Sequence, residues 1–164
     1  MAVLESTDAG SVRSAGGEGT GQADAVAESG GQSSGAEGWT VVEVIDGDTI
    51  GVERSDGVRE RVRLIGIDTP ERGECGYQRA SAAMAAYVDG ATVELVAGAR
   101  DDRDAYDRLL RYVDVDGVDV ELELIEAGLA VARYDSRDGY GRHDREDAYV
   151  AADARYEHVC LTGR

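Results

Sequence analysis

Two clusters of acidic residues have the composition of a metal site. Asp46-Gly47-Asp48-Thr49 and Asp68-Thr69-Pro70-Glu71 each follow a segment that we expect to be a β-strand. Neighbouring strand ends of a small barrel can bring such clusters together. Asp48, Asp68 and a backbone carbonyl such as that of Thr69 would then offer hard oxygen ligands, which suit Ca²⁺. Taken singly, the first cluster is also typical of a hairpin turn and the second of a helix N-terminus.

Two arginines are placed where they could bind a phosphate group. Arg63 lies on the predicted strand that leads into the second acidic cluster. If Val62 and Leu64 face the core, Arg63 points the other way, towards the clusters. Arg108 ends a run that starts at Asp104, just before another predicted strand. An arginine can hold a phosphate through two parallel hydrogen bonds. We expect most of the other arginines to pair with surface acids.

The composition of the chain is strongly acidic. Among 164 residues, 34 Asp and Glu stand against 17 bases, all of them Arg, and the net charge is −17. Such a charge argues against non-specific binding to nucleic acid or to an anionic membrane, although a local site can still bind an anion. A halophilic origin would explain the acids, because salt screens their repulsion. A GC-rich genome, which favours Arg over Lys, is the alternative explanation for the arginines.

The chain divides into an arm and a domain. Residues 1–38 contain 9 Gly and 6 Ser and no aromatic residue, which predicts a disordered, acidic, Gly/Ser-rich arm. Residues 39–164 form the predicted domain. No signal peptide is visible, so a cytoplasmic protein and the mature form of an exported one are both open. An arm of this kind suits a surface tether, and we expect an extracellular or tethered protein; a solvated terminus of no specific function is the alternative.

The predicted elements of the domain are short strands with few helices. β-Branched runs bounded by turn residues predict strands, and Ala-rich or helically spaced apolar segments predict helices. The order places three strands first, then a helix, two strands and two helices. This order predicts an α+β, mainly β fold: a five-stranded OB-fold Greek-key barrel with about three helices. The expected strands are 39–45, 49–54, 58–67, 92–96 and 109–115, and the expected helices are 75–89, 118–127 and 142–157.

Four motifs in order resemble the signatures of staphylococcal-type (thermonuclease-like) nucleases. They are Val44–Thr49, Arg63–Glu71, Asp104–Leu109 and Leu124–Ala130. The resemblance covers about residues 41–157. It implies an OB-fold barrel with three helices and a Ca²⁺-dependent nuclease that hydrolyses DNA and RNA to leave 3′-phosphate ends.

The resemblance also implies roles for the acidic residues. By position, Asp48 and Asp68 would bind Ca²⁺ through their carboxylates, and Thr69 through its carbonyl oxygen. Glu71 would be the general base that activates the attacking water. Asp46 would be an outer acid near the metal. The chemistry is consistent, because hydrolysis of a phosphodiester requires an activated water and cancellation of the developing charge.

The remaining site residues implied by the resemblance are arginines and tyrosines. Arg63 and Arg108 would neutralise the transition state, and Tyr106 and Tyr134 would lie along the nucleotide pocket. One departure is Asp107, which stands where the family commonly has Gly. An acid at this position would weaken the contact of Arg108 with phosphate or change the turn.

Cys75 and Cys160 are the two cysteines of the chain. In an exported protein they would form a disulfide, worth about 2–4 kcal/mol; the alternative is two free thiols. Two Cys and two His cannot build the usual four-ligand zinc site. His143 and His158 are expected on the surface of the last helix.

The sequence therefore predicts a monomeric, metal-dependent nuclease with Ca²⁺ as cofactor and nucleic acid as substrate. The second interpretation is an OB-fold module that binds nucleic acid or Ca²⁺ with little catalysis. The third is a salt-adapted structural domain.

Overall fold

The computed structural model describes residues 38–160. The arm predicted over residues 1–38 lies, apart from Gly38, outside this range and stays a prediction. No helix within the described range is long and apolar enough to cross a membrane.

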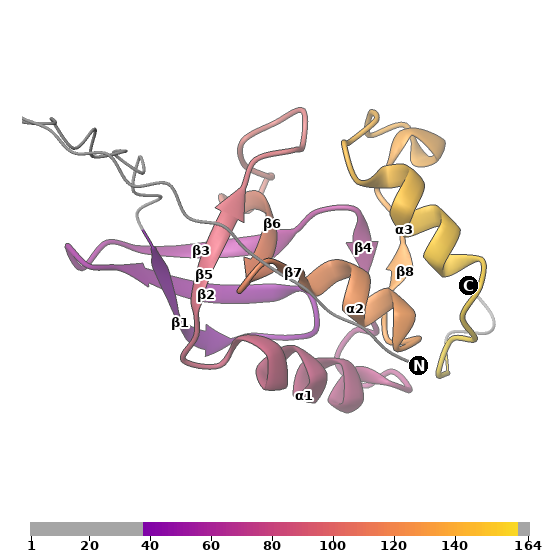
Figure 1. Cartoon of the computed structure of the whole chain (residues 1–164), viewed down its shortest axis with the longest axis horizontal. Helices are drawn as coiled ribbons and strands as arrows, with labels where there is room; N and C mark the ends of the chain where they lie inside the picture. The colour runs from indigo at the N-terminus through magenta and orange to yellow at the C-terminus, as the bar shows by residue number, and fades with distance from the viewer. Residues whose placement is uncertain (1–37, 161–164) are drawn as a thin grey trace, which may run out of the picture. The chain divides into compact units, whose positions relative to one another are not determined.

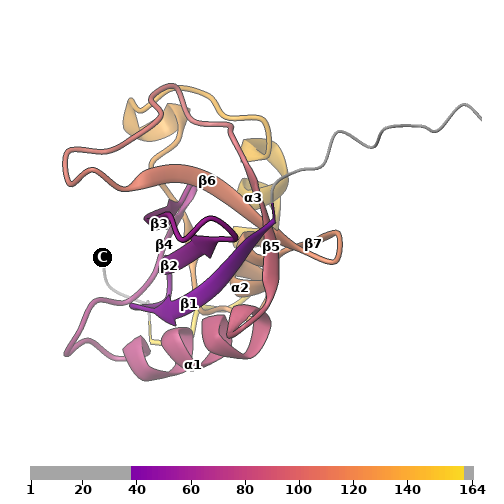
Figure 2. The same cartoon turned by 90° about the vertical axis from the view of Figure 1, so that its left-hand side faces the viewer.

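Five strands close into a barrel (Figures 1 and 2). The sheet order is β3-β2-β1-β5-β6-β7, and β3 also pairs with β6, which closes the ring. The β3–β6 pairing is parallel and the others are antiparallel. An irregularity in β1 between Val41 and Glu43 bends the strand, as closure of a small barrel requires. The barrel strands are β1 (Trp39–Val44), β2 (Thr49–Arg54), β3 (Arg59–Leu64), β5 (Thr92–Val96) and β6 (Leu109–Val115).

Three helices and three short strands complete the domain. In both views α1 lies beneath the barrel, and Figure 1 shows α2 and α3 on its right. Strand β4 pairs with β8 in a separate two-stranded sheet. Strand β7 pairs antiparallel with β6 at the end of the larger sheet. These elements are β4 (Ile67–Asp68), α1 (Tyr77–Val88), β7 (Val118–Asp119), α2 (Val120–Glu126), β8 (Val131–Ala132) and α3 (Glu146–Asp153), with a 3₁₀ turn, η1, at Ser136–Asp138. The predicted OB-fold barrel with three helices is confirmed.

The third predicted strand is interrupted. We expected one strand over 58–67, but β3 ends at Leu64 and β4 begins at Ile67. Gly66 lies between them with φ +77°, a left-handed conformation that breaks a strand. Ile65, the residue after β3, is buried. The turn directs β4, which ends in Asp68, towards β8.

The last predicted helix was too long. It was expected over 142–157, whereas α3 spans only Glu146–Asp153. Tyr149 and Ala152 are the buried apolar residues through which this helix packs on the core.

The core uses tyrosines in place of phenylalanine, so their hydroxyl groups need partners. Tyr112 and Tyr149 are fully buried and pack edge to face. The hydroxyl of Tyr112 contacts His143 Nδ1 at 2.8 Å and accepts the backbone N–H of Arg145. The hydroxyl of Tyr149 donates to Asp119 at 2.9 Å. Because α3 carries Tyr149 and β6 carries Tyr112, these hydrogen bonds fix α3 against the barrel.

One buried acid lies in this core. Glu121, on α2, is fully buried, and both its oxygens accept the backbone N–H of Val113, at 3.1 and 3.2 Å. Burial, followed by the negative charge of Asp119, raises the pKa of Glu121 well above its ordinary value. A raised pKa means that the stability contributed by this group is present at low pH and is lost as the pH rises through the folded-state value.

Replacing Glu121 with Gln should therefore stabilise the protein at alkaline pH. Glutamine can still accept the hydrogen bond of Val113 and carries no charge. We expect Glu121→Gln to raise the free energy of unfolding by about 1–3 kcal/mol at pH 8 and to change it little at pH 5. Urea unfolding at both pH values measures the difference, with Glu126→Gln, an exposed acid of the same helix, as the control. An equal effect of Glu121→Gln at both pH values would contradict this account.

Candidate active site

A cleft of about 590 Å³ opens beside the ends of β2 and β3. Its walls come from these strands, from the segment before β6 and from the segment before α3. Among its lining residues are six of the predicted site residues: Asp48, Arg63, Glu71, Tyr106, Arg108 and Tyr134. Asp68 and Thr69 are buried next to it.

The two acidic clusters lie in direct contact. Asp48 is buried, with 5% of its surface exposed. Its Oδ2 atom accepts hydrogen bonds from the backbone N–H and the hydroxyl of Thr69, at 3.0 and 2.9 Å. This contact joins the turn before β2 to the residue after β4. Segments 21 residues apart in the sequence thus form one acidic site.

Arg63 lies between the two buried carboxylates. Its Nη2 atom is 3.3 Å from Asp48 Oδ2 and 3.8 Å from Asp68 Oδ1. The guanidinium also donates to the carbonyl oxygens of Leu64 and Ile67, at 2.7 and 3.0 Å. With only 12% of the side chain exposed, the guanidinium is held at the wall of the cleft. As the strand alternation predicted, it points away from the core.

Arg108 is held by an acid that the sequence analysis did not single out. Its guanidinium contacts Asp104 Oδ2 through Nε at 2.7 Å and Nη2 at 2.6 Å, and Nη1 donates to Thr49 Oγ1 at 3.2 Å. Thr49 in turn donates to Asp48 Oδ1. Burial opposes ionisation of Asp104, but hydrogen bonds from Arg108 and from backbone N–H groups outweigh it and lower its pKa. The spacing of four residues between Asp104 and Arg108 was the available sequence signal.

The turn before Arg108 keeps its shape despite Asp107. Asp107 adopts a left-handed conformation with φ +62°, and its N–H donates to the carbonyl of Asp104 at 3.1 Å. The carboxylate is 85% exposed and faces Arg103 at 3.6 Å. The acid therefore points away from Arg108, and the turn that glycine would favour is present.

Glu71 differs from the other acids of the site. It is exposed on the loop after β4, and its side chain makes no hydrogen bond or ion pair with any residue in the described range. It lines the cleft with Asp46. Burial, and then the charge of Asp48, raises the pKa of Asp46. Of the acids that line the cleft, Glu71 is thus the one free to accept a proton from a bound water.

The oxygen donors suit a hard divalent cation. Two carboxylates and a backbone carbonyl, from Asp48, Asp68 and Thr69, match the ligands that Ca²⁺ takes in irregular geometry with retained water. Within residues 38–160, no three His, Cys, Asp or Glu side chains gather as a metal cluster. The donor chemistry of Asp48, Asp68 and Thr69 fits a hard divalent cation that also takes oxygen ligands from outside the protein.

Tyrosines flank the arginines on both sides of the cleft. The guanidinium of Arg108 lies 5.5 Å from the ring centre of Tyr106, which is 72% exposed. Arg63 lies 5.5 Å from the ring centre of Tyr134, whose hydroxyl reaches Asp68 Oδ1 at 3.4 Å. Burial, and then the charge of Asp68, raises the pKa of Tyr134. Tyr140, which was not predicted as a site residue, packs edge to face on Tyr134.

The histidines lie elsewhere than predicted. His143 was expected on a helix surface, but it precedes α3, is 95% buried and lines the cleft. Burial lowers its pKa. Nothing in its sequence neighbourhood distinguishes it from a surface residue, because the acids and arginines around it suggest solvent. His158 is half-buried and contacts Asp153 at 3.1 Å.

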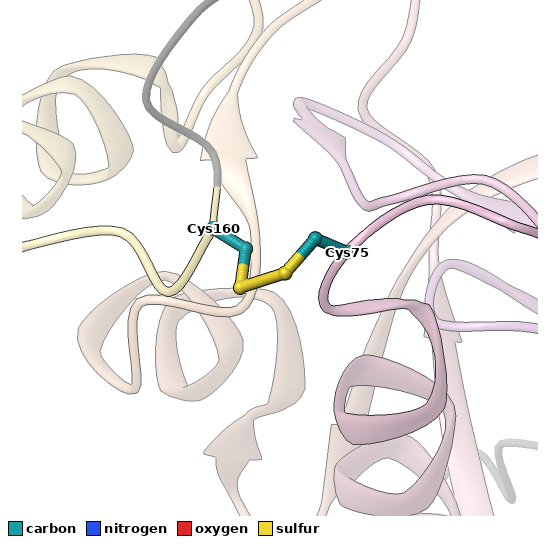
Figure 3. Close-up of a disulfide and its surroundings, with 2 residues drawn as sticks. All are labelled: Cys75 and Cys160. Carbon is teal, nitrogen blue, oxygen red and sulfur yellow. A yellow bond between two sulfur atoms is a disulfide. The ribbon is translucent and has the colours of Figure 1, made fainter.

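Cys75 and Cys160 are joined by a disulfide bond (Figure 3). Their Cα atoms are 5.4 Å apart across 85 residues of sequence. Cys75 lies on the loop that carries Glu71, directly before α1. The bond therefore connects one edge of the candidate site to the C-terminal end of the described chain.

Replacing Asp107 with Gly should stabilise the turn before Arg108. Glycine adopts positive φ without the steric cost of a Cβ, so we expect Asp107→Gly to raise the free energy of unfolding by about 1 kcal/mol. The exposed ion pair with Arg103 is too weak to offset this gain. Thermal unfolding measures the effect, and Asp107→Val, which has a β-branched side chain, should destabilise the protein. A gain in both variants would show that strain at this position is not the cause.

Comparison with known proteins assigns the chain to a family. Residues 61–161 match the family model described as staphylococcal nuclease homologue. The chain is 37% identical over 104 residues to the thermonuclease of Staphylococcus intermedius, covering 60% of this chain and 61% of that protein. It is 38% identical over 101 residues, 58% of its length, to two Bacillus subtilis proteins, endonuclease YncB and the SPbeta prophage-derived endonuclease YokF. The matched region spans 47% and 34% of these two relatives. The chain belongs to the staphylococcal nuclease homologue family.

Proposed function

We propose that the protein is a nuclease that hydrolyses phosphodiester bonds of DNA and RNA, with Ca²⁺ as cofactor, and leaves 3′-phosphate ends. The observation that carries the proposal is the presence in one cleft of two oriented arginines, a pair of contacting acidic clusters and an exposed carboxylate. Relatives named thermonuclease and endonuclease support the same reaction class.

The arginines would bind the phosphate. Arg63 and Arg108 both line the cleft and are both linked to Asp48, directly or through Thr49. Their positions are fixed before substrate arrives, so little reorganisation is needed when charge develops on the phosphoryl oxygens. Ca²⁺, held by Asp48, Asp68 and the carbonyl of Thr69, would supply further positive charge to the same oxygens.

Glu71 would be the general base. Its side chain has no partner among the described residues and faces the cleft, so it can take a proton from a water molecule. The water oxygen attacks phosphorus, the bond between phosphorus and the 5′ oxygen breaks, and the leaving oxygen takes a proton from solvent. The products are a 3′-phosphate and a 5′-hydroxyl.

A binding module with little catalysis is the second candidate. Arg63 is already in contact with Asp48 and Asp68, and Arg108 with Asp104. A phosphate must compete with these carboxylates for the guanidinium groups, which favours weak binding and slow turnover. Cleavage assays separate the two functions.

We also propose that the protein acts outside the cytoplasm as a monomer. The disulfide supports this location, because such bonds persist in oxidising compartments.

Removing the base or the first arginine should slow cleavage by at least about 10²-fold. We expect the full chain to cleave single-stranded DNA and RNA in Ca²⁺ and to be inactive with a chelator. Glu71→Gln should lower kcat by about 10²–10⁴-fold, and Arg63→Ala by about 10²–10³-fold. Gel analysis of end-labelled substrates measures both rate and end chemistry. Arg59→Ala, an exposed arginine paired with Glu53, is the matched control and should keep full activity. Binding without cleavage in the unaltered protein would favour the second candidate.

The salt dependence should differ from that of a basic nuclease. The net charge of −17 repels a polyanion, and salt screens this repulsion. We expect kcat/KM on long single strands, at saturating Ca²⁺, to hold or rise between about 20 and 200 mM salt. A dinucleotide substrate carries little charge and should show a smaller effect. A steep fall with salt on long strands, as for proteins that bind by counterion release, would contradict this prediction.

A further inference from the structure

The position of Glu71 depends on its loop, because its side chain makes no hydrogen bond or ion pair with another described residue. Pro70 before it is buried, and α1 begins at Tyr77. Between them, residues 71–75 are all exposed, and Gly76 is half-buried. Thus the candidate base stands on a short exposed segment between two anchored ends.

The internal bonds of this loop are open to solvent. The N–H of Glu71 donates to the carboxylate of Glu74 at 2.7 Å, and the N–H of Glu74 donates to the carbonyl of Glu71 at 2.9 Å. Gly73 turns the chain with φ +93°. Exposed hydrogen bonds of this kind contribute little to local stability, so a covalent attachment at the end of the loop would restrict its conformations further.

The segment before Cys160 is attached to the rigid part of the domain. The N–H of Val159 donates to the carbonyl of Gly128, at the end of α2, at 2.9 Å. Gly128 has φ +68°, and a Cβ there would lie 2.2 Å from the carbonyl oxygen of Glu157, so the segment packs directly on this turn. The carbonyl oxygen of Val159 also lies close to Gly76, because a Cβ added to Gly76 would be 3.2 Å from this oxygen.

The disulfide joins this attached segment to the end of the Glu71 loop (Figure 3). We propose that Cys75 and Cys160 are positioning residues: their bond holds the loop so that Glu71 faces the cleft, and its reduction slows cleavage without weakening nucleic-acid binding. The effect on rate rests on the proposed function. The bonds that hold Asp48, Arg63 and Arg108 connect them to one another, to the barrel strands and to Thr69, and none of these bonds involves residues 71–75, so we expect the three side chains to keep their positions when the disulfide is broken.

The redox step uses an external dithiol. Both cysteines are exposed, so a small dithiol can reach them. The dithiol transfers two electrons and two protons to the disulfide, which yields two cysteine thiols and one oxidised, cyclic disulfide of the reagent. An oxidant of the disulfide class reverses the step.

The test combines hydrogen exchange with kinetics on the full chain, with and without dithiothreitol. We expect reduction to speed amide exchange at residues 71–76, to lower kcat on single-stranded DNA by roughly tenfold and to leave KM unchanged. Reoxidation should restore both. Unchanged exchange at residues 71–76, or a rise in KM with no fall in kcat, would overturn the proposal. Amide exchange can be measured without nuclease activity. A failure of the proposed function is therefore distinguished from a failure of the disulfide to hold the loop.

Three variants control the experiment. Cys75→Ser and Cys160→Ser both remove the bond and should match each other and the reduced protein, while neither should respond to dithiothreitol. If Cys160→Ser behaves like the oxidised protein, the bond has no role. In Glu71→Gln the residual rate should be insensitive to reduction, because the loop then carries no base; a tenfold loss there would assign the effect to general unfolding. Circular dichroism confirms that each variant is folded.

Discussion

The candidate site depends on the contact of one guanidinium with two buried carboxylates. Arg63 lies within 4 Å of both Asp48 and Asp68, and it is further fixed by two backbone carbonyl groups. Buried acids of this kind would repel each other if no cation stood between them. The arginine therefore offsets the repulsion between the two acids, and the acids in turn fix the position of its guanidinium. Removing either partner leaves an uncompensated charge.

The strand pairing of the barrel fixes the positions of the residues that make this contact. Thr49 pairs with Arg63 across β2 and β3, and Val62 pairs with Leu109 across the parallel seam of β3 and β6. This parallel pairing places Arg108, just before β6, beside the first residue of β2. A chain of polar contacts then runs from Asp104 through Arg108 and Thr49 to Asp48. Two arginines, Arg63 and Arg108, are thus held at fixed positions in a cleft that acids also line.

Short-range sequence patterns predicted the strand bounds and side-chain directions that depend on neighbouring residues. The strands 49–54, 92–96 and 109–115 were predicted to the residue, because β-branched runs end at clear turns. The side of the strand on which Arg63 lies followed from simple alternation. Features that depend on tertiary contacts were missed. The last helix was predicted too long, and His143, expected on a helix surface, is buried with no signal in its sequence neighbourhood. The pairing of Asp104 with Arg108 had a local signal in their spacing of four residues, but the contact of Arg108 with Thr49 depends on the fold.

Calorimetric titration of Ca²⁺ into the full chain distinguishes a specific metal site from general uptake of the ion by the acidic surface. We expect one site, with an affinity that falls at least about tenfold in Asp48→Asn. Asparagine can still accept the hydrogen bonds of Thr69, so the fold is expected to survive this change. A nucleoside 3′,5′-bisphosphate should bind the Ca²⁺-loaded protein and fail to bind Arg63→Ala. Equal Ca²⁺ binding by the unaltered chain and Asp48→Asn would show that the acidic surface takes up the ion and that the proposed site does not exist.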